Sequence, residues 1–220
     1  MVKNEAVVVL SGGMDSTTLL YYAIKKHDVV YAISFDYGQK HKRELELAKL
    51  TCKKLNIDHE IFDLTILNKL APSALTRDNI DVPEGHYEAE NMKQTVVPNR
   101  NMVLVSLAAS YAMGIEAQYL YYGAHAGDHA IYPDCRKEFA EKLRDVIKIA
   151  DWTEVELLFP FIDIDKGDIV IEGIKLGVDY SLTHTCYKGN IKACGKCGSC
   201  QERLEAFEKA GIKDPIEYEV

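Results

Sequence analysis

The segment Ser11 to Leu20, SGGMDSTTLL, combines residue types that hold phosphate groups. Its two glycines let backbone N–H groups approach an anion, and Ser11 and Ser16 add hydroxyl donors. The segment follows an apolar run, Val7 to Leu10, and opens a helical pattern whose amino end attracts anions. A Walker loop carries a lysine here, whereas this segment carries Asp15. The pattern indicates phosphate chemistry without a Walker lysine; a tight turn capped by Asp15 or Ser16 is the structural alternative.

Four cysteines near the carboxyl end, Cys186, Cys194, Cys197 and Cys200, form a second motif with the spacing C-x7-C-x2-C-x2-C. Four thiolates at such spacing are typical of a closed, tetrahedral zinc site. An iron–sulfur cluster and free thiols are the alternatives. The ferredoxin run continues to a Cys-Pro, whereas Gln201 follows Cys200 here. The spacing therefore favours one structural zinc ion (Zn²⁺) per chain.

Segments with strand and helix patterns alternate along the chain. Apolar runs predict strands at residues 7–10, 29–35, 59–64, 119–122 and 155–161. Apolar stripes predict helices at 16–26, 40–55, 99–113 and 166–176, and one whose inner face runs from Phe139 to Ala150. The alternation predicts an α/β fold with a doubly wound parallel sheet. In such folds the working site lies beyond the carboxyl ends of the strands.

Two regions follow from the same pattern. Residues 1–180 are expected to form a nucleotide-binding α/β domain, and residues 181–220 a four-cysteine zinc module with a carboxyl-terminal helix. The stretch 65–98 is polar and interrupted by prolines and a glycine. So long a connection in a compact domain predicts a lid or insertion, with disorder as the alternative.

The composition limits the possible partners. The 220 residues carry a formal net charge of -8, which disfavours direct binding to a nucleic-acid backbone. No stretch approaches the roughly 18 apolar residues that a membrane-spanning helix needs, so we expect no membrane association and a cytoplasmic location. In that compartment thiols stay reduced, which agrees with a metal site rather than disulfides.

The string Ser-Gly-Gly-x-Asp-Ser after the first strand resembles the loop of the PP-loop ATP pyrophosphatases, which hold the departing pyrophosphate of ATP. The strings VVPNRNMVLVSLA, GAHAGDHAIYPDCR and FPFIDIDKGDI and the cysteine tail follow in order over nearly the whole chain. This set resembles the 7-cyano-7-deazaguanine synthase family, whose fold is like that of the adenine nucleotide α-hydrolases. The resemblance implies ATP-dependent conversion of 7-carboxy-7-deazaguanine and ammonia to the nitrile through an adenylate and an amide.

The resemblance also implies ATP and Mg²⁺ as cofactors, a homodimer, and zinc on the four cysteines. It assigns ATP to one continuous segment, Leu10, Ser11, Gly12, Gly13, Met14, Asp15, Ser16, Thr17, Thr18, Leu19 and Leu20. Three residues at the end of the second strand, Asp36, Tyr37 and Gln39, would lie near the base or ribose, or form only a polar turn. The catalytic residues are expected to be Asp15, as a Mg²⁺ partner or an organiser of the loop, together with Arg100 and Asp128.

The substrate residues come from two strings, PNRN and the segment after the fourth strand. They are Asn99, Arg100, His125, Asp128, His129, Tyr132, Asp134 and Arg136. Arg100 would neutralise charge at the α-phosphate. Asp128 or Asp134 would accept hydrogen bonds from the planar base, and Tyr132 would stack on it. A helix cap with a surface arginine is the alternative for Asn99 and Arg100.

Three other functions remain open from the sequence. A PP-loop enzyme that thiolates tRNA would need a basic face and a nucleophilic cysteine, for which Cys135 is the candidate. A non-catalytic nucleotide-binding module would leave the polar strings after each strand unexplained. A relative that stops at the amide would carry the same motifs. The products, AMP and pyrophosphate or ADP and phosphate, and the later fate of the nitrile also stay open.

Overall fold

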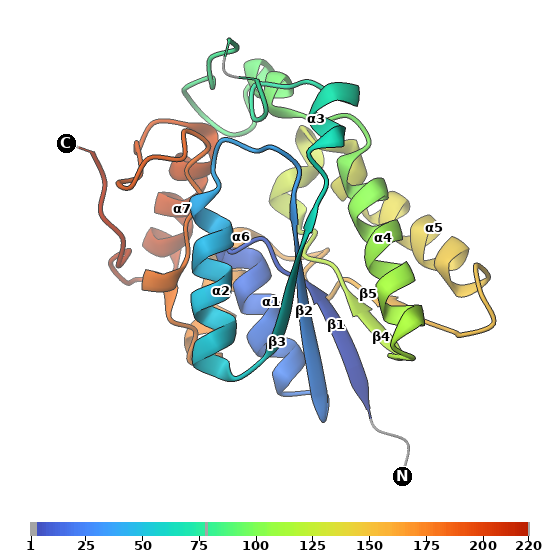
Figure 1. Ribbon diagram of the computed structural model, residues 1–220. Coiled ribbons are helices and arrows are strands. Elements are labelled where there is room, and N and C mark those ends of the chain that lie inside the picture. Colours follow the sequence, from blue (N-terminus) through green and yellow to red (C-terminus); the bar gives the residue numbers. More distant parts are fainter. Residues whose placement is uncertain (1–3, 78, 220) are drawn as a thin grey trace.

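The computed structural model describes residues 4–77 and 79–219. Its centre is a sheet of five parallel strands in the order β3-β2-β1-β4-β5 (Figure 1). The strands are β1 (Glu5–Val9), β2 (Val29–Asp36), β3 (Asp58–Asp63), β4 (Tyr119–Tyr121) and β5 (Glu156–Leu158). The chain winds outward from β1 in both directions, and the predicted doubly wound α/β fold is confirmed.

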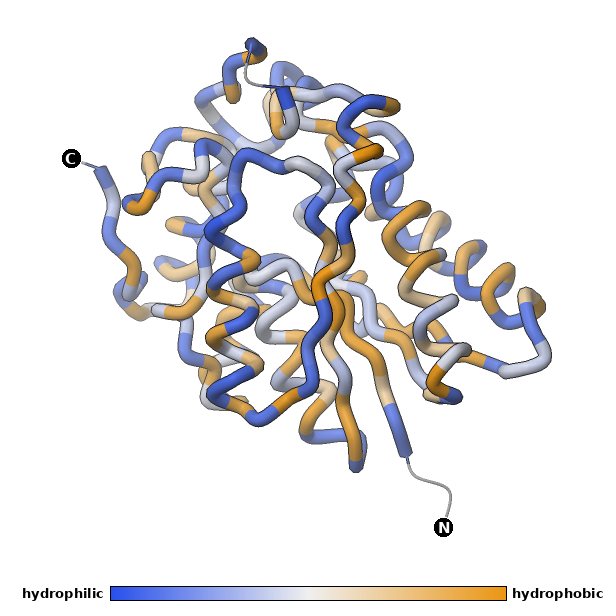
Figure 2. Tube along the Cα trace, viewed as in Figure 1, coloured by the Kyte–Doolittle hydropathy of each residue, from blue (hydrophilic) through white to orange (hydrophobic). Residues whose placement is uncertain are grey.

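Helices cover both faces of the sheet (Figure 1). One layer holds α1 (Met14–Ile24), α2 (Arg43–Leu55) and α6 (Lys166–Leu176), with α7 (Gly198–Lys209) packed on α6, and the other holds α4 (Arg100–Gly114) and α5 (Lys137–Lys148). Successive side chains of β1 point to opposite faces of the sheet and pack alternately against the two helix layers. Val8 packs in the core with Leu19 of α1, whereas Val7 packs with Val105 of α4. Apolar residues accordingly concentrate in the strands and on the inner sides of the helices (Figure 2).

Local chemistry sets the element boundaries. Helix α6 begins where the Asp165 side chain accepts a hydrogen bond from the Asp168 N–H at 3.0 Å. It ends at Gly177, which has a positive φ of 80°. These bounds match the prediction. Strand β5 is shorter than the predicted 155–161, because a turn that contains Pro160 follows it and proline has no N–H for the ladder.

The stretch between β3 and α4 contains α3 (Ile66–Leu70) and a 3-10 helix, η1 (Glu90–Thr95). It packs on the cysteine region, where the Gly85 N–H donates to the Lys196 carbonyl at 3.0 Å. Further 3-10 helices are η2 (Ala126–Ala130) and η3 (Pro133–Cys135) after β4, and η4 (Tyr180–Leu182) after α6. Across the two described ranges, no helix combines the length and apolar character that crossing a membrane requires.

Candidate functional site

The loop between β1 and α1 is held in a shape that only glycine allows. Gly12 has a φ of 92°, and a Cβ there would overlap the backbone carbonyl of Glu44. The Ser16 hydroxyl contacts the Ser11 hydroxyl at 2.9 Å and accepts a hydrogen bond from the Ser11 N–H at 3.1 Å. Gly13 is the N-cap of α1 and has no capping side chain, so the amino end of α1 is left for an anion.

This loop opens into a cavity at the carboxyl ends of β1 and β4, the two strands from which the chain winds in opposite directions. Ligands of doubly wound folds bind at this switch point. The cavity has a volume of about 210 Å³. Its polar and ionisable lining side chains are Ser11, Asp15, Ser16, Tyr37, His41, Glu44, Arg100, Asn101, Tyr122, Asp128, Cys135, Lys166, Thr185, Tyr187 and Ser199.

A buried group of charges, which we call the Lys166 cluster, lies at one wall; it comprises Asp15, His125, Asp128, Lys166 and Glu202. The Lys166 Nζ is 2.5 Å from Glu202 Oε2 and 3.4 Å from Asp15 Oδ2. The His125 Nε2 is 3.4 Å from Asp128 Oδ2 and 3.7 Å from Asp15 Oδ2. Four separate parts of the chain, α1, the segment around η2, α6 and α7, thus meet at the glycine loop.

The charge states of the Lys166 cluster follow from its contacts. Burial alone would lower the pKa of Lys166, but the Asp15 and Glu202 carboxylates raise that pKa well above its usual value. Burial would raise the pKa of Asp128, yet the neighbouring His125 and Lys166 lower it. Near neutral pH the cluster therefore contains a permanent ammonium group and an ionised Asp128.

Arg100 is presented to the cavity by the first turn of α4. Asn99, the residue before α4, has a positive φ of 60° and does not cap the helix with its side chain. The Asp134 carboxylate instead accepts the Asn101 N–H at 3.0 Å and fixes the start of the helix. The Arg100 guanidinium lies 5.7 Å from the centre of the Tyr37 ring, and its Nη1 is 3.4 Å from the Tyr37 hydroxyl.

The predicted site residues divide between the cavity and its surroundings. Those that line the cavity are Ser11, Gly13, Asp15, Ser16, Tyr37, Arg100 and Asp128. Tyr132 lines an adjoining hollow, and its hydroxyl is 3.1 Å from that of Tyr187. His125 is buried behind the cavity in the Lys166 cluster.

Other predicted residues lie outside the cavity lining. Gln39 folds back onto the backbone, where it accepts the Tyr37 N–H at 2.9 Å. Asp36 pairs with Lys42 at 2.8 Å, and the Arg136 side chain donates to the carbonyl of His129 at 2.9 Å. Within the loop segment, Leu10, Leu19 and Leu20 are core residues, and the Thr18 hydroxyl contacts the Tyr180 hydroxyl at 2.8 Å.

Several residues at the cavity were not among those predicted from the sequence. Lys166, Glu44, Thr185, Tyr187, Ser199 and Glu202 belong to the cavity wall or the Lys166 cluster. Lys166 lies in the string FPFIDIDKGDI, which follows β5, so its position after a strand was the available signal. Glu44 and Glu202 lie within ordinary-looking amphipathic helices, and no local pattern distinguishes them from surface glutamates.

The four cysteines converge as their spacing predicted. Their side chains are buried, and their ligand atoms all lie within 4.8 Å of one another. Cys194 Sγ is 3.9 Å from Cys200 Sγ and accepts the Cys197 N–H at 3.3 Å. Around a single tetrahedral ion with metal–sulfur bonds of about 2.3 Å, the sulfur atoms are separated by roughly 3.8 Å. This arrangement is suited to one metal ion bound by four thiolates.

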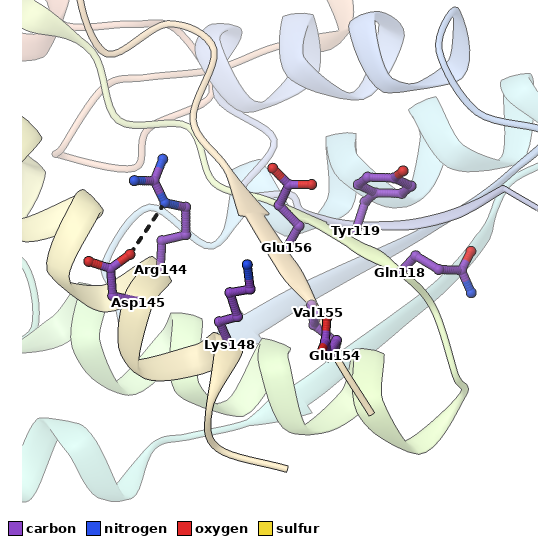
Figure 3. Close-up of a pocket in the computed structure, with 8 residues that line it drawn as sticks. All are labelled: Gln118, Tyr119, Arg144, Asp145, Lys148, Glu154, Val155 and Glu156. Atoms are coloured by element: carbon purple, nitrogen blue, oxygen red, sulfur yellow. Dashed lines mark ion pairs between the residues drawn. The ribbon is translucent and has the colours of Figure 1, made fainter. Parts of the chain in front are cut away.

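A larger hollow, of about 590 Å³, lies at the opposite end of the sheet (Figure 3). Its lining side chains are Gln118, Tyr119, Arg144, Asp145, Lys148, Glu154, Val155 and Glu156. They come from α5 and from the amino ends of β4 and β5, and Arg144 pairs with the adjacent Asp145. It contains neither the glycine loop nor the amino end of α1, so the smaller cavity is the candidate site.

Comparison with known proteins identifies the family of the chain. The family model described as "Queuosine biosynthesis protein QueC" matches residues 5–211. A 7-cyano-7-deazaguanine synthase of Caldicellulosiruptor saccharolyticus is 62% identical over 98% of this chain and 96% of its own length. One from Methanoregula boonei is 60% identical, over 98% of this chain and 99% of its own.

A solved 4-thiouridine synthetase, in complex with RNA and ATP, shares the fold with a TM-score of 0.55 at 18% identity. The alignment covers 94% of this chain and 50% of that chain, so the likeness is one of fold alone. The family match and the two close relatives each span nearly the whole of this chain. The chain therefore belongs to the QueC family.

Proposed function

We propose that this protein converts 7-carboxy-7-deazaguanine and ammonia to 7-cyano-7-deazaguanine at the expense of ATP. One observation supports this proposal above the others. The amino end of α1, which no side chain caps, lies beside the Lys166 cluster at the switch-point cavity. A pyrophosphate group needs both N–H donors and a fixed cation, and this wall supplies both. The family membership identifies the acid that would be activated there.

The chemistry requires that a carboxylate oxygen become a leaving group. Attack of the substrate carboxylate on the α-phosphorus would give an acyl adenylate, which ammonia converts to an amide. A second adenylation, of the amide oxygen, would allow loss of that oxygen to give the nitrile. Arg100, which also lines the cavity, is the candidate for neutralising charge on the α-phosphate. Asp128 is a candidate for hydrogen bonding to the deazaguanine base, and Tyr37 is a candidate for contact with its ring.

Magnesium is part of the proposal, with Asp15 as its protein ligand. Asp15 Oδ1 is buried and has no hydrogen-bond partner among the described residues, which leaves a carboxylate oxygen available. Carboxylate and phosphate oxygens are the ligands that Mg²⁺ prefers. The ion would supply charge neutralisation to the phosphates. The Lys166 ammonium group holds the other oxygen of Asp15 and thereby orients the carboxylate.

Zinc is the proposed occupant of the cysteine site. A four-iron cluster distributes its cysteine ligands over separate iron atoms, which keeps the sulfur atoms farther apart than around a single ion. Ligand atoms within 4.8 Å of one another support the single ion. Such an ion would hold together the short region around α7, and reduced thiols agree with a cytoplasmic location.

Thiolation of tRNA is less well supported. Cys135, the candidate nucleophile, is buried, and its Sγ lies 3.2 Å from the side-chain nitrogen of Asn101. Burial and the neighbouring Asp128 and Asp134 raise the pKa of this thiol well above its usual value. A thiol that stays protonated is a poor nucleophile.

The direct test of the proposed function is incubation of the metal-loaded protein with Mg-ATP, ammonium and 7-carboxy-7-deazaguanine. We expect mass spectrometry to detect first the amide and then the nitrile. Nucleotide analysis of the same samples distinguishes AMP with pyrophosphate from ADP with phosphate. Absence of both amide and nitrile from a folded, metal-loaded sample would disprove the proposal, and amide alone would identify an enzyme that stops at that stage.

We also propose a homodimer, which uses the exposed apolar residues Val146, Ile149 and Trp152. Val146 is 59% exposed although it was predicted on the inner face of α5, and Ile149 and Trp152 are exposed further still. Trp152→Ser should shift the protein from dimer to monomer in analytical ultracentrifugation, because burial of apolar surface drives association. Leu70→Ser, at an exposed leucine on α3, is the matched control and should stay dimeric. A monomeric wild-type protein at micromolar concentration would contradict this prediction.

A further inference from the structure

The carboxyl group of Glu44 lies in the candidate site and takes part in none of the contacts described above. It is the second residue of α2 and lies close to the glycine loop, where its Oε1 would be 3.9 Å from a Cβ on Gly13. Three carboxyl side chains line the cavity: those of Asp15, Glu44 and Asp128. Within residues 4–77 and 79–219, Asp15 and Asp128 have ion-pair partners, whereas Glu44 makes no side-chain hydrogen bond or ion pair.

The backbone fixes Glu44 at this place. Its N–H donates to the His41 carbonyl at 3.2 Å, and its own carbonyl packs directly against Gly12. Any movement of Glu44 would therefore displace the phosphate loop. Glu44 is 9% exposed, and it lines the cavity. A carboxyl group that lines the cavity and has no partner among the described residues is available to a bound substrate.

The surroundings favour a carboxyl group that gains and loses a proton. Burial raises the pKa of Glu44 well above its usual value; Arg100, Lys166 and Arg203 oppose this, and Asp15 adds to it. The other ionisable groups nearby are His41, His184, Tyr37 and Tyr187. Burial lowers the pKa of His41 to about 3, so this imidazole is neutral near pH 7.

We propose that Glu44 is the general base that accepts protons from nitrogen, an inference that rests on the proposed function. In the first stage, the lone pair of ammonia forms a C–N bond to the acyl carbon of the adenylate. The C–O bond breaks and its electron pair leaves with AMP. The nitrogen, now positively charged, transfers one proton to the Glu44 carboxylate and becomes the amide nitrogen.

The same base serves the second stage. Adenylation of the amide oxygen releases pyrophosphate and leaves a C=NH₂ group with a positive charge. Once Glu44 has released the proton of the first stage to water, it accepts a proton from one N–H bond, whose electron pair becomes the nitrogen lone pair. After Glu44 has released this proton to water, it accepts the second one, whose N–H electron pair forms the third C–N bond as AMP leaves. The nitrile thus requires two further proton transfers from the same nitrogen atom.

The test compares Glu44→Gln with wild type and with Glu46→Gln, an exposed glutamate on the same helix. Three steps are measured separately: pyrophosphate–ATP exchange dependent on the carboxylate substrate, amide formation from ammonium, and nitrile formation from added amide. Glutamine keeps the size and polarity of a protonated glutamate, so exchange should change less than about 3-fold. Both nitrogen steps should slow by about 100-fold or more, the range expected for loss of a general base. Glu46→Gln should match wild type throughout.

The pH profile gives a second readout. The base acts when ionised, so at a constant concentration of free ammonia the wild-type amide-forming rate should rise with pH through a pKa above the usual glutamate range, and Glu44→Gln should lose this limb. Glu44→Asp, a shorter carboxylate, should recover part of the rate and the limb. Exchange that falls as far as amide formation, or a nitrogen step at the wild-type rate in Glu44→Gln, would overturn the proposal. Absence of amide in wild type would instead reject the proposed function.

Discussion

Replacing Lys166 by methionine should lower pyrophosphate–ATP exchange by about 100-fold or more, the usual effect of removing one charge-stabilising group. The Lys166 Nζ holds Asp15 and Glu202 at 3.4 and 2.5 Å. Without this ammonium group the glycine loop faces a triphosphate with carboxylates and no fixed cation on that wall. The measurement is exchange of labelled pyrophosphate into ATP, with circular dichroism as the test of folding.

Lys209→Met is the matched control. Lys209 also pairs with acidic residues at the start of α6, at 2.7 Å from both Asp165 and Asp168, but its side chain is 44% exposed. Because exposed ion pairs contribute little, this variant should retain nearly full exchange. If Lys166→Met is unstable because it leaves buried carboxylates unpaired, Lys166→Met combined with Glu202→Gln removes one of these charges and should restore folding but not exchange. Near wild-type exchange in a folded Lys166→Met variant would refute the role.

Replacing Cys197 by serine should release the metal ion and destabilise the protein by at least about 5 kcal/mol, since structural zinc supplies roughly 10 kcal/mol or more in zinc fingers. Cys197 is the N-cap residue of α7, and Cys200 lies within the first turn. The predicted metal content falls from one ion per chain to none, as measured by inductively coupled plasma mass spectrometry. Chemical denaturation reports the loss of stability.

Cys52→Ser is the control, because Cys52 is a buried cysteine in the core between α2 and the sheet. It should lose some packing energy and retain its metal. Pyrophosphate exchange should also fall in Cys197→Ser, since α7 carries Glu202 to Lys166 only five residues after the N-cap cysteine. An unchanged metal content in Cys197→Ser would contradict ligation by all four cysteines.

The sequence by itself determined the features whose physics is local. The glycine loop could be predicted because its backbone shape and the helix that follows it depend on neighbouring residues, as the positive φ of Gly12 illustrates. The cysteine site could be predicted because its last three thiols lie within seven residues, which leaves few ways to arrange them in space. The alternation of strands and helices could be predicted because strands that are buried on both faces of a parallel sheet have long apolar runs.

Only the tertiary structure decided which charged residues reach the cavity. Lys166 meets Asp15 because α6 packs beside α1, and Glu202 joins them because α7 packs on α6. Residues 15, 166 and 202 are far apart in the chain, so no spacing rule relates them. The structure also separated Gln39 and Arg136, which bond to nearby backbone, from Tyr37 and Arg100, which face the cavity.

The loop lacks a Walker lysine, and the folded chain brings a lysine to it from another helix. Asp15 occupies the loop, and its partner Lys166 begins α6, with 150 residues between them. A sequence determines what its own segments can become, because propensity, turns and close ligand spacing act over a few residues. Pairing between distant charges depends on how helices pack against a shared sheet, and this is fixed only when the whole chain has folded.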